Sequence, residues 1–199
     1  MSVDFKSSRT KENLMRAFAG ESQARNRYTF AASAAKSQNM HVVEVVFNFT
    51  AGQEKEHAEI FYNHLSEVAG ENIKVDGAYP VDISRSILDL LRCAQHNEYE
   101  EYNDAYKSFA AIAREEGFDS IAADFERIAE IEKHHGDRFG KIADLVESGK
   151  LYASDVSLDW LCLNCGHIHH GQNTPERCPV CHHDKGYFIR LTMAFCEEN

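Results

Sequence analysis

Basic residues are scarce in this chain compared with acidic ones. Its 199 residues include 21 Lys and Arg against 32 Asp and Glu, which gives a formal net charge of −11. So acidic a chain argues against a nucleic acid or an anionic membrane as the main partner.

Long apolar runs are also absent from the sequence. No stretch approaches the roughly 20 residues of a membrane span, and Met1–Thr10 is polar, without the apolar core of a secretion signal. We therefore expect a cytoplasmic protein.

Proline is almost absent from residues 1–147, where Pro80 stands alone. Apolar residues there recur at spacings of three and four, which predicts long amphipathic helices. The segment Gly70–Ser84 is too long for a tight turn and indicates a crossover connection. One long connection among four long helices favours a mainly α, ferritin-like four-helix bundle. The predicted helices span about Arg9–Ser37, Met40–Val68, Ser84–Glu116 and Asp119–Glu147.

The composition changes near residue 148, which predicts a bundle domain over 1–147, a linker over 148–158 and a small domain over 159–199. This last part is too small to be stabilised by a hydrophobic core alone, so it needs a cross-link such as a bound metal ion. Four of the six cysteines can supply the ligands, as two C-x-x-C pairs: Cys162, Cys165, Cys178 and Cys181. Four thiolates at this spacing can bind one metal ion, and both zinc and iron fit the geometry.

The other cysteines and the histidines of the tail receive no metal role. Cys93 lies in a helical apolar pattern and is interpreted as a packed thiol, and Cys196 has no assigned function. Four cysteines already fill a tetrahedral site. We therefore interpret the tail's histidines as solvated loop residues: His167, His169, His170, His182 and His183.

The second and fourth predicted helices carry copies of one motif. Glu54-Lys-Glu-His57 is followed by Phe61, and Glu132-Lys-His-His135 is followed by Phe139. Residues three apart on a helix face the same direction, so each Glu-x-x-His can present both side chains to one point.

The first and third predicted helices each add one glutamate to this pattern. Glu21 lies 33 residues before Glu54, and Glu98 lies 34 residues before Glu132. Each of the four glutamates lies on the same helical face as apolar residues. Burying an ionised carboxylate on such a face without a partner costs several kcal/mol of folding free energy. Four Glu and two His suit two iron or manganese ions, whose four positive charges balance four carboxylates.

Two further features of these helices leave alternatives open. Glu101 lies three residues after Glu98 and is either a seventh ligand or a solvated glutamate of an acidic run. The pair Glu130 and His134 also faces one direction, but it has no equivalent in the second helix. We interpret that pair as exposed.

With these motifs in one chain, the sequence resembles the rubrerythrin family over nearly its whole length. The resemblance implies a ferritin-like di-iron bundle followed by a rubredoxin-like domain with one iron, for which zinc is a possible substitute. It implies that Glu54 and Glu132 bridge two irons and that one iron moves between Glu101 and His57. The implied terminal ligands are Glu21, Glu98, Glu101 and His135, with Tyr28 and Tyr106 bonded to ligand carboxylates.

The resemblance also implies an activity and partners. Its members reduce hydrogen peroxide to water in oxidative-stress defence, with electrons from a separate NAD(P)H-linked reductase or a rubredoxin passed through the tetrathiolate iron. They form homodimers in which that iron serves the partner's di-iron site, and we expect a homodimer or a higher homo-oligomer here. Two alternatives are ferritin-like iron oxidation and storage, and a non-enzymatic bundle whose zinc tail recognises a partner. The cysteine tail and Glu101 argue against storage, which needs neither.

Overall fold

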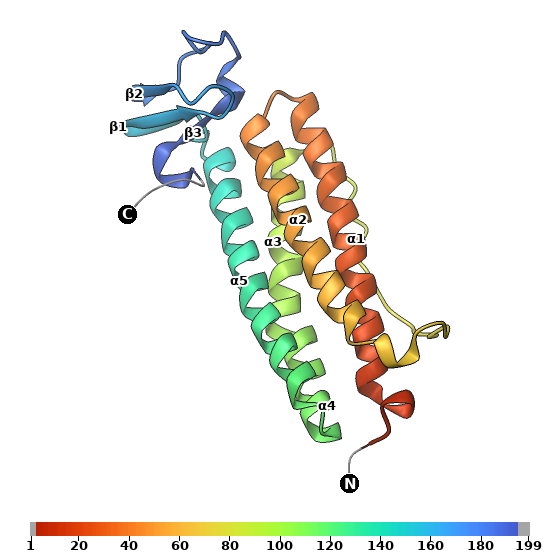
Figure 1. Cartoon of the computed structure of the whole chain (residues 1–199). Coiled ribbons are helices and arrows are strands. Elements are labelled where there is room, and N and C mark those ends of the chain that lie inside the picture. Colours follow the sequence, from red (N-terminus) through yellow and green to blue (C-terminus); the bar gives the residue numbers. More distant parts are fainter. Residues whose placement is uncertain (1–2, 195–199) are drawn as a thin grey trace.

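The computed structural model describes residues 3–194, so Cys196 lies outside the described residues. Long helices form a bundle, and a small sheet lies at the end where the first helix meets the second (Figure 1). Among residues 3–194, no helix has both the length and the apolar character needed to cross a membrane. The mainly α fold class predicted from the sequence is confirmed.

The first two helices pack side by side. Helix α1 spans Arg9–Ser37, the range predicted, and Ser8 caps it by accepting a hydrogen bond from Lys11 N. Helix α2 spans His41–Asn63 and ends before the predicted Val68. The chain then changes to i→i+3 hydrogen bonds, from Leu65 N to Tyr62 O and from Val68 N to Leu65 O. Because such turns still bury Leu65 and Val68, their spacing imitates a continuing α-helix.

The third predicted helix is wrong as a single α-helix. It comprises α3 (Ile87–Glu100), a π-helical turn (Glu101–Ala105) and α4 (Tyr106–Glu116). π-Helical turns of this kind occur inside α-helices and are frequent at functional sites. Helix α5 spans Asp119–Glu147, as predicted.

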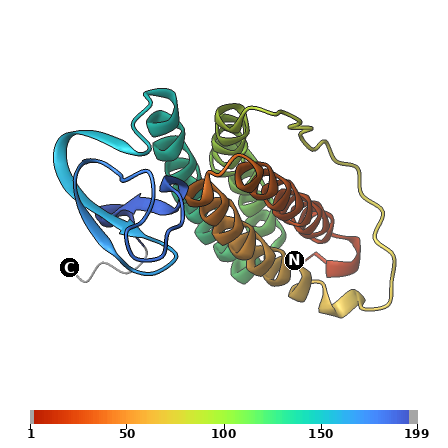
Figure 2. The ribbon, with the colours of Figure 1, turned by 90° about the horizontal axis from the view of Figure 1, so that it is seen from above.

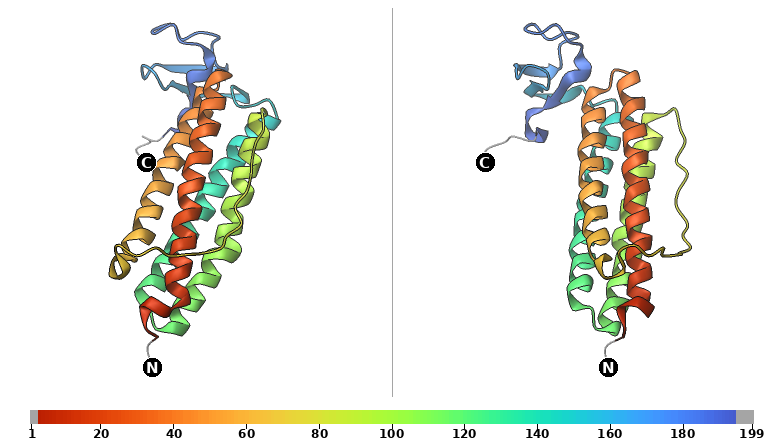
Figure 3. Two further views of the ribbon diagram at one scale, coloured as in Figure 1. Left: turned by 90° about the vertical axis from the view of Figure 1, so that its right-hand side faces the viewer. Right: turned by 45° about the vertical axis from the view of Figure 1, so that its right-hand side comes forward.

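The connection between α2 and α3 is a crossover. Viewed from above and from two further sides, this segment runs along the outside of α1 and α3 (Figures 2 and 3). It has no regular secondary structure over residues 71–84. Side-chain contacts therefore fix its course.

The tail forms a three-stranded antiparallel sheet in the order β2-β1-β3. The strands are β1 (Ala153–Cys162), β2 (Ile168–Asn173) and β3 (Phe188–Arg190). Trp160 is fully buried with Cys162, Cys178 and Phe188, and its indole Nε1–H donates to Gly171 O at 2.9 Å.

Two apolar clusters fill the bundle, one above the other. The cluster nearer the tail contains Phe47 and Phe139, whose ring centroids lie 5.1 Å apart. The other contains Phe61 and Phe125, at 4.9 Å. Each long helical rod passes from one cluster into the other. The acidic residues singled out in the sequence lie in the belt between the clusters.

Candidate metal centres

Six side chains of this belt form two overlapping groups of possible metal ligands. Within each group, one ligand atom per residue lies within 4.8 Å of the others, and all six residues are buried. Glu54 and Glu132 belong to both groups. Glu21 and His57 complete the first group, and Glu98 and His135 complete the second.

The two Glu-x-x-His motifs contact each other across the bundle. His57 Nδ1 lies 2.8 Å from Glu132 Oε1, and His135 Nδ1 lies 3.0 Å from Glu54 Oε1. Within each motif the separations are 3.2 Å for His57 Nδ1 and Glu54 Oε2, and 2.7 Å for His135 Nδ1 and Glu132 Oε2. The imidazole rings are stacked with centroids 5.5 Å apart. All four side chains therefore face the same small volume.

The cluster has more buried polar atoms than its own hydrogen bonds satisfy. Both carboxylate oxygens of Glu132 and both ring nitrogens of His135 are buried without a hydrogen-bond partner, although their separations are short. Buried polar groups ordinarily have partners. Oxygen and imidazole lone pairs converging without hydrogen-bond geometry suit a divalent cation. Further unpartnered oxygens belong to Glu21, Glu54 and Glu98.

Without metal, the cluster is electrostatically strained. Burial raises the pKa of Glu21 and of Glu98 well above the usual range, and neighbouring carboxylates raise both further. Burial alone lowers the pKa of His57 and of His135, but the facing carboxylates outweigh it and raise these values to about 9 and about 12. The metal-free site therefore takes up protons where cations otherwise balance its charge.

Two buried tyrosines fix the carboxylates contributed by single-glutamate helices. The Tyr28 hydroxyl donates to Glu98 Oε1, and the Tyr106 hydroxyl donates to Glu21 Oε1. The two contacts are equivalent in the two halves of the bundle. Each leaves the other oxygen of its glutamate, Oε2, without a hydrogen-bond partner.

Glu101 is placed differently from the other predicted ligands. It belongs to neither group, is half-buried, and begins the π-helical turn on the wall of a surface cavity. Burial and the charge of Glu98 raise its pKa well above the usual range. Its role as a ligand stays a prediction.

The competing pair on α5 points away from the cluster. Glu130 and His134 are both exposed, and neither belongs to a metal-binding group formed by residues 3–194.

One charged residue beside the cluster escaped the sequence analysis. Arg138 is half-buried, and its Nη1 donates to Thr50 Oγ1 and Gln53 Oε1, both at 2.9 Å. Burial lowers its pKa, against the opposing effect of Glu54, Glu98 and Glu132. It therefore contributes positive charge within reach of the acidic cluster. Its position three residues after His135 is the signal that could have revealed it.

The four tail cysteines form a second candidate centre. Their sulfur atoms lie within 4.8 Å of one another, and Cys162 Sγ–Cys181 Sγ and Cys165 Sγ–Cys178 Sγ measure 3.7 and 3.6 Å. A tetrahedral site with metal–sulfur bonds of about 2.3 Å has sulfur–sulfur edges of about 3.8 Å. The thiols are therefore spaced for one ion.

The two cysteine turns have the same local design. In each, the residue after the second cysteine has positive φ, 76° at Gly166 and 62° at His182. The backbone N–H of that residue donates a hydrogen bond to the carbonyl oxygen of the first cysteine. The tail histidines lie outside the group of four thiols among the described residues. His170, for example, pairs with Asp159 at 2.8 Å.

Comparison with known proteins decides the family. The sequence model of the rubrerythrin family matches residues 12–143, and that of the rubrerythrin rubredoxin-like domain matches residues 160–189. The chain belongs to the rubrerythrin family. Rubrerythrin from Clostridium perfringens is 42% identical over 92% of this chain and 94% of its own length. Rubrerythrin from Nitratidesulfovibrio vulgaris is 39% identical over 94% and 96%.

Solved structures agree with this membership. Nigerythrin in a fully reduced, all-ferrous state is 30% identical, with a TM-score of 0.62 over 96% of this chain and 88% of that one. A bacterioferritin from Mycobacterium tuberculosis, at 19% identity, covers 74% of this chain and 90% of its own with a TM-score of 0.62, which shows the ferritin-like fold alone. Membership of the rubrerythrin family indicates an oxidoreductase. The carboxylate–histidine groups and the four-cysteine group match the iron binding of that family.

Proposed function

We propose that this protein is a non-haem di-iron peroxidase that reduces hydrogen peroxide to water. Its electrons arrive from a separate NAD(P)H-linked reductase or a rubredoxin through one iron bound by the four cysteines. One observation carries the proposal: two ligand groups that share Glu54 and Glu132 occur in the same chain as a four-thiol centre. When bound, the iron pair supplies Lewis acidity and the two electrons that cleavage of the O–O bond consumes.

The residues of the belt have distinct tasks in this proposal. Glu54 and Glu132 hold both metal positions, because each belongs to both groups. Glu21 with His57, and Glu98 with His135, complete the two positions. Tyr28 and Tyr106 orient Glu98 and Glu21 by hydrogen bonds. The apolar clusters above and below the belt exclude water from it.

Substrate and protons enter from one side. Tyr106 donates to the ligand candidate Glu21, and Glu101 lies one helical turn after the ligand candidate Glu98. Both residues also line a cavity that opens to solvent. We assign proton delivery to this wall, because these groups lie between solvent and the metal positions.

The distance between the two centres supports a homodimer. Tyr187, whose carbonyl accepts a hydrogen bond from Leu163 beside Cys162, stacks on His41 at the start of α2. From His41 to Glu54 the helix rises by about 20 Å. A separation this long disfavours electron transfer within one chain. It favours a dimer in which the cysteine centre of one subunit serves the bundle of the other.

Replacement of one shared ligand tests the proposal. We expect Glu132→Ala to abolish peroxide consumption driven by NADH and a reductase, while the visible absorption of the iron–cysteine centre persists. The matched control is Glu130→Ala, an exposed glutamate two residues earlier on α5, which should keep full turnover. Undiminished turnover in Glu132→Ala, or an iron-loaded wild type that does not consume peroxide, would refute the proposal.

A further inference from the structure

A cavity of about 560 Å³ lies beside the bundle, between α1, the π-helical turn and the crossover segment. The crossover runs outside α1 and α3 (Figure 3), and its residues 77–80 line the outer side of the cavity. The sequence did not predict it, because the residues that form it come from three distant segments.

The inner wall of this cavity adjoins the iron site. Glu101 and Tyr106 line it, and Tyr106 also donates to Glu21 of the first ligand group. Gly20, the residue before Glu21, lines it as well and leaves the space that a side chain would fill. A molecule in the cavity therefore lies against groups that neighbour the metal positions.

The outer wall is anchored by side chains. The Tyr79 hydroxyl donates to Arg16 O at 3.0 Å, and its ring lies 3.7 Å from the place of a Cβ at Gly20. Arg16 Nη2 contacts Asp76 Oδ1 at 2.8 Å. At the other end of this segment, Asp82 Oδ2 accepts from Arg27 at 2.6 Å and from Asn97 at 2.7 Å. These contacts fix one end of the crossover to α1 and the other end to both α1 and α3, with the cavity between the two anchors.

The cavity is much larger than hydrogen peroxide requires. A water molecule in the liquid occupies roughly 30 Å³, so a molecule of two oxygen atoms needs about 60 Å³. Cavities of about 300–1,000 Å³ are typical of sites for organic ligands. The aromatic rings of Tyr79 and Phe109 form part of the wall. Both arginines of the wall, Arg16 and Arg27, are paired with carboxylates of the crossover, and carboxylates of α3 and the π-helical turn line the cavity as well. This charge distribution disfavours an anionic ligand and suits a neutral hydroperoxide.

We propose that this cavity binds the organic group of an uncharged aryl or alkyl hydroperoxide, so that the chain reduces organic hydroperoxides as well as hydrogen peroxide. The inference rests on the proposed peroxidase function and defines its substrate class. In this reaction the O–O bond breaks, and the hydroperoxide takes up two electrons and two protons. The carbon-bound oxygen leaves as an alcohol and the other oxygen as water. The electrons arrive by the same reductase and cysteine-centre route.

Filling the cavity tests the proposal by kinetics. In the iron-loaded full-length protein, Gly20→Leu projects a side chain into the cavity, and Gly52→Leu is the matched control. Gly52 is an exposed helical glycine, and a Cβ there meets nothing within 4 Å. We expect Gly20→Leu to lower kcat/KM for cumene hydroperoxide by about tenfold or more, as loss of a buried apolar contact worth 1–3 kcal/mol does. Its kcat/KM for hydrogen peroxide should fall by a smaller factor, because the smaller molecule occupies less of the cavity, so the readout is the ratio of the two kcat/KM values.

A binding measurement without turnover separates this inference from the proposed function. Equilibrium dialysis with 2-phenylpropan-2-ol, the alcohol product, should show one site per chain in the wild type and in Gly52→Leu. Binding to Gly20→Leu should be weaker by about tenfold. No binding to the wild type at millimolar alcohol, or equal binding to all three proteins, overturns the inference, and so does an equal change for both peroxides in Gly20→Leu. A wild type that binds the alcohol but reduces neither peroxide overturns the peroxidase function and leaves the cavity assignment standing.

Discussion

Glu54 Oε1 of α2 lies 3.0 Å from His135 Nδ1 of α5, so the glutamate of one Glu-x-x-His motif faces the histidine of the other. The reverse contact, between Glu132 and His57, is 2.8 Å. Because the motifs interlock reciprocally, each shared glutamate lies between two histidines. This arrangement explains why both motifs are needed to define two adjacent metal positions.

Two adjacent histidines of α5 provide a sharp test of the ligand assignment. His135 is fully buried against Glu54 and Glu132, whereas His134 is exposed. We expect His135→Ala to lower the iron content of the bundle by about one ion per chain and to reduce peroxide turnover. The loss of turnover should exceed the about 10- to 100-fold that removal of an outer-shell partner costs.

The neighbouring variant His134→Ala is the control for this prediction. It should bind iron and turn over peroxide like the wild type, as measured by metal analysis and stopped-flow kinetics. Equal loss of iron in both variants would contradict the assignment of His135.

The candidate ligands could be predicted because the information that defines them is local. Glu132 and His135 are three residues apart on one helix, and the copy at Glu54 and His57 excluded the alternative pair with His134. The helical periodicity of the surrounding apolar residues also predicted the bounds of α1 and α5.

Other features depend on contacts that the sequence pattern does not encode. The π-helical turn at Glu101 is a local change to i→i+5 backbone hydrogen bonding inside a continuous helical rod, and no proline or glycine marks its position in the sequence. The cavity depends on Arg27 and Asp82, 55 residues apart, whose pairing has no periodic signal. The early end of α2 at Asn63 was also missed, because the 3-10 turn that follows it buries the apolar residues that a continuing α-helix would bury.

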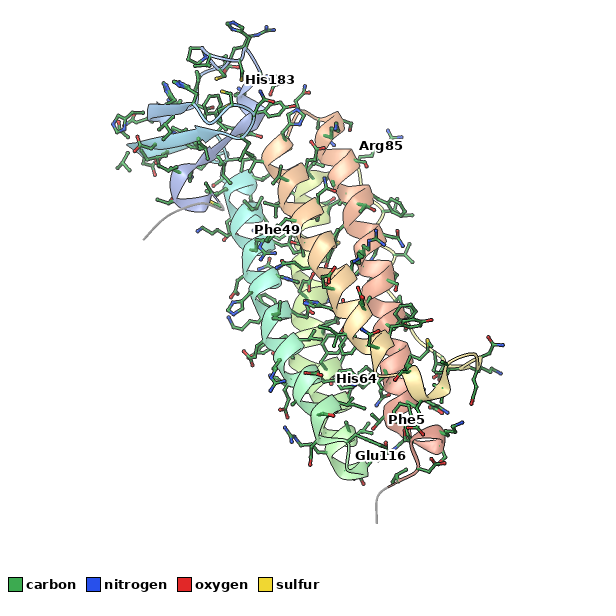
Figure 4. All side chains as sticks on the ribbon, in the orientation of Figure 1. Phe5, Phe49, His64, Arg85, Glu116 and His183 are labelled. Atoms are coloured by element: carbon green, nitrogen blue, oxygen red, sulfur yellow. The ribbon has the colours of Figure 1, made fainter. Side chains whose placement is uncertain are left out.

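The end of the bundle distant from the tail depends on Glu116. This buried carboxylate accepts hydrogen bonds from Arg9 N at 3.0 Å, Thr10 N at 2.9 Å and Thr10 Oγ1 at 2.7 Å, and so caps the first turn of α1 from the end of α4. Phe5 and Glu116 lie together at this end, far from His183 (Figure 4). We expect Glu116→Ala to lower the free energy of unfolding by about 2–3 kcal/mol, because buried donors lose their partner.

Glu115 provides the matched control, since it is exposed and pairs with the same Arg9 at 2.6 Å. Glu115→Ala should cost less than about 1 kcal/mol, measured by denaturant unfolding of the metal-loaded proteins. Burial raises the pKa of Glu116, but the hydrogen bonds from Thr10 and Arg9 outweigh it and lower the pKa below its usual 4.5. The contribution of Glu116 is therefore present above pH 4.5 and lost as the pH falls through the lowered value. Similar losses in both variants would exclude the cap.

Metal removal should make the stability of the bundle depend on pH. In the metal-free protein, the pKa of Glu21 and of Glu98 is raised by burial, and that of His57 is raised from 6.5 to about 9 by Glu132 and Glu54 against the effect of burial. The His57 contribution is complete below pH 6.5 and is lost as the pH rises through about 9. The two glutamates act in the same direction, because their ionised forms destabilise the folded state.

We therefore expect the Tm of the metal-free protein to fall as the pH rises from about 5 to about 9. The iron-loaded protein should show a smaller slope, because its ligands stay deprotonated when the metal is bound. Scanning calorimetry of both forms at matched pH values measures the difference. A metal-free Tm that rises over this interval would contradict the predicted protonation of the cluster.

The contact between the tail and the bundle depends on a glycine. Gly186 packs so closely against the turn between α1 and α2 that a Cβ there would lie 1.8 Å from Asn39 O, and the next residue, Tyr187, stacks on His41 with ring centroids 3.9 Å apart. Gly186→Ala must therefore displace the tail from this turn, at a cost of about 1–3 kcal/mol. We expect amide exchange around Asn39 and Tyr187 to accelerate by about tenfold, while the cysteine centre keeps its metal.

Gly171→Ala is the control, because its nearest contact is the end of the His169 side chain at 3.2 Å, which can rotate away. Unchanged exchange in Gly186→Ala, measured by mass spectrometry, would show that the tail is held by other contacts.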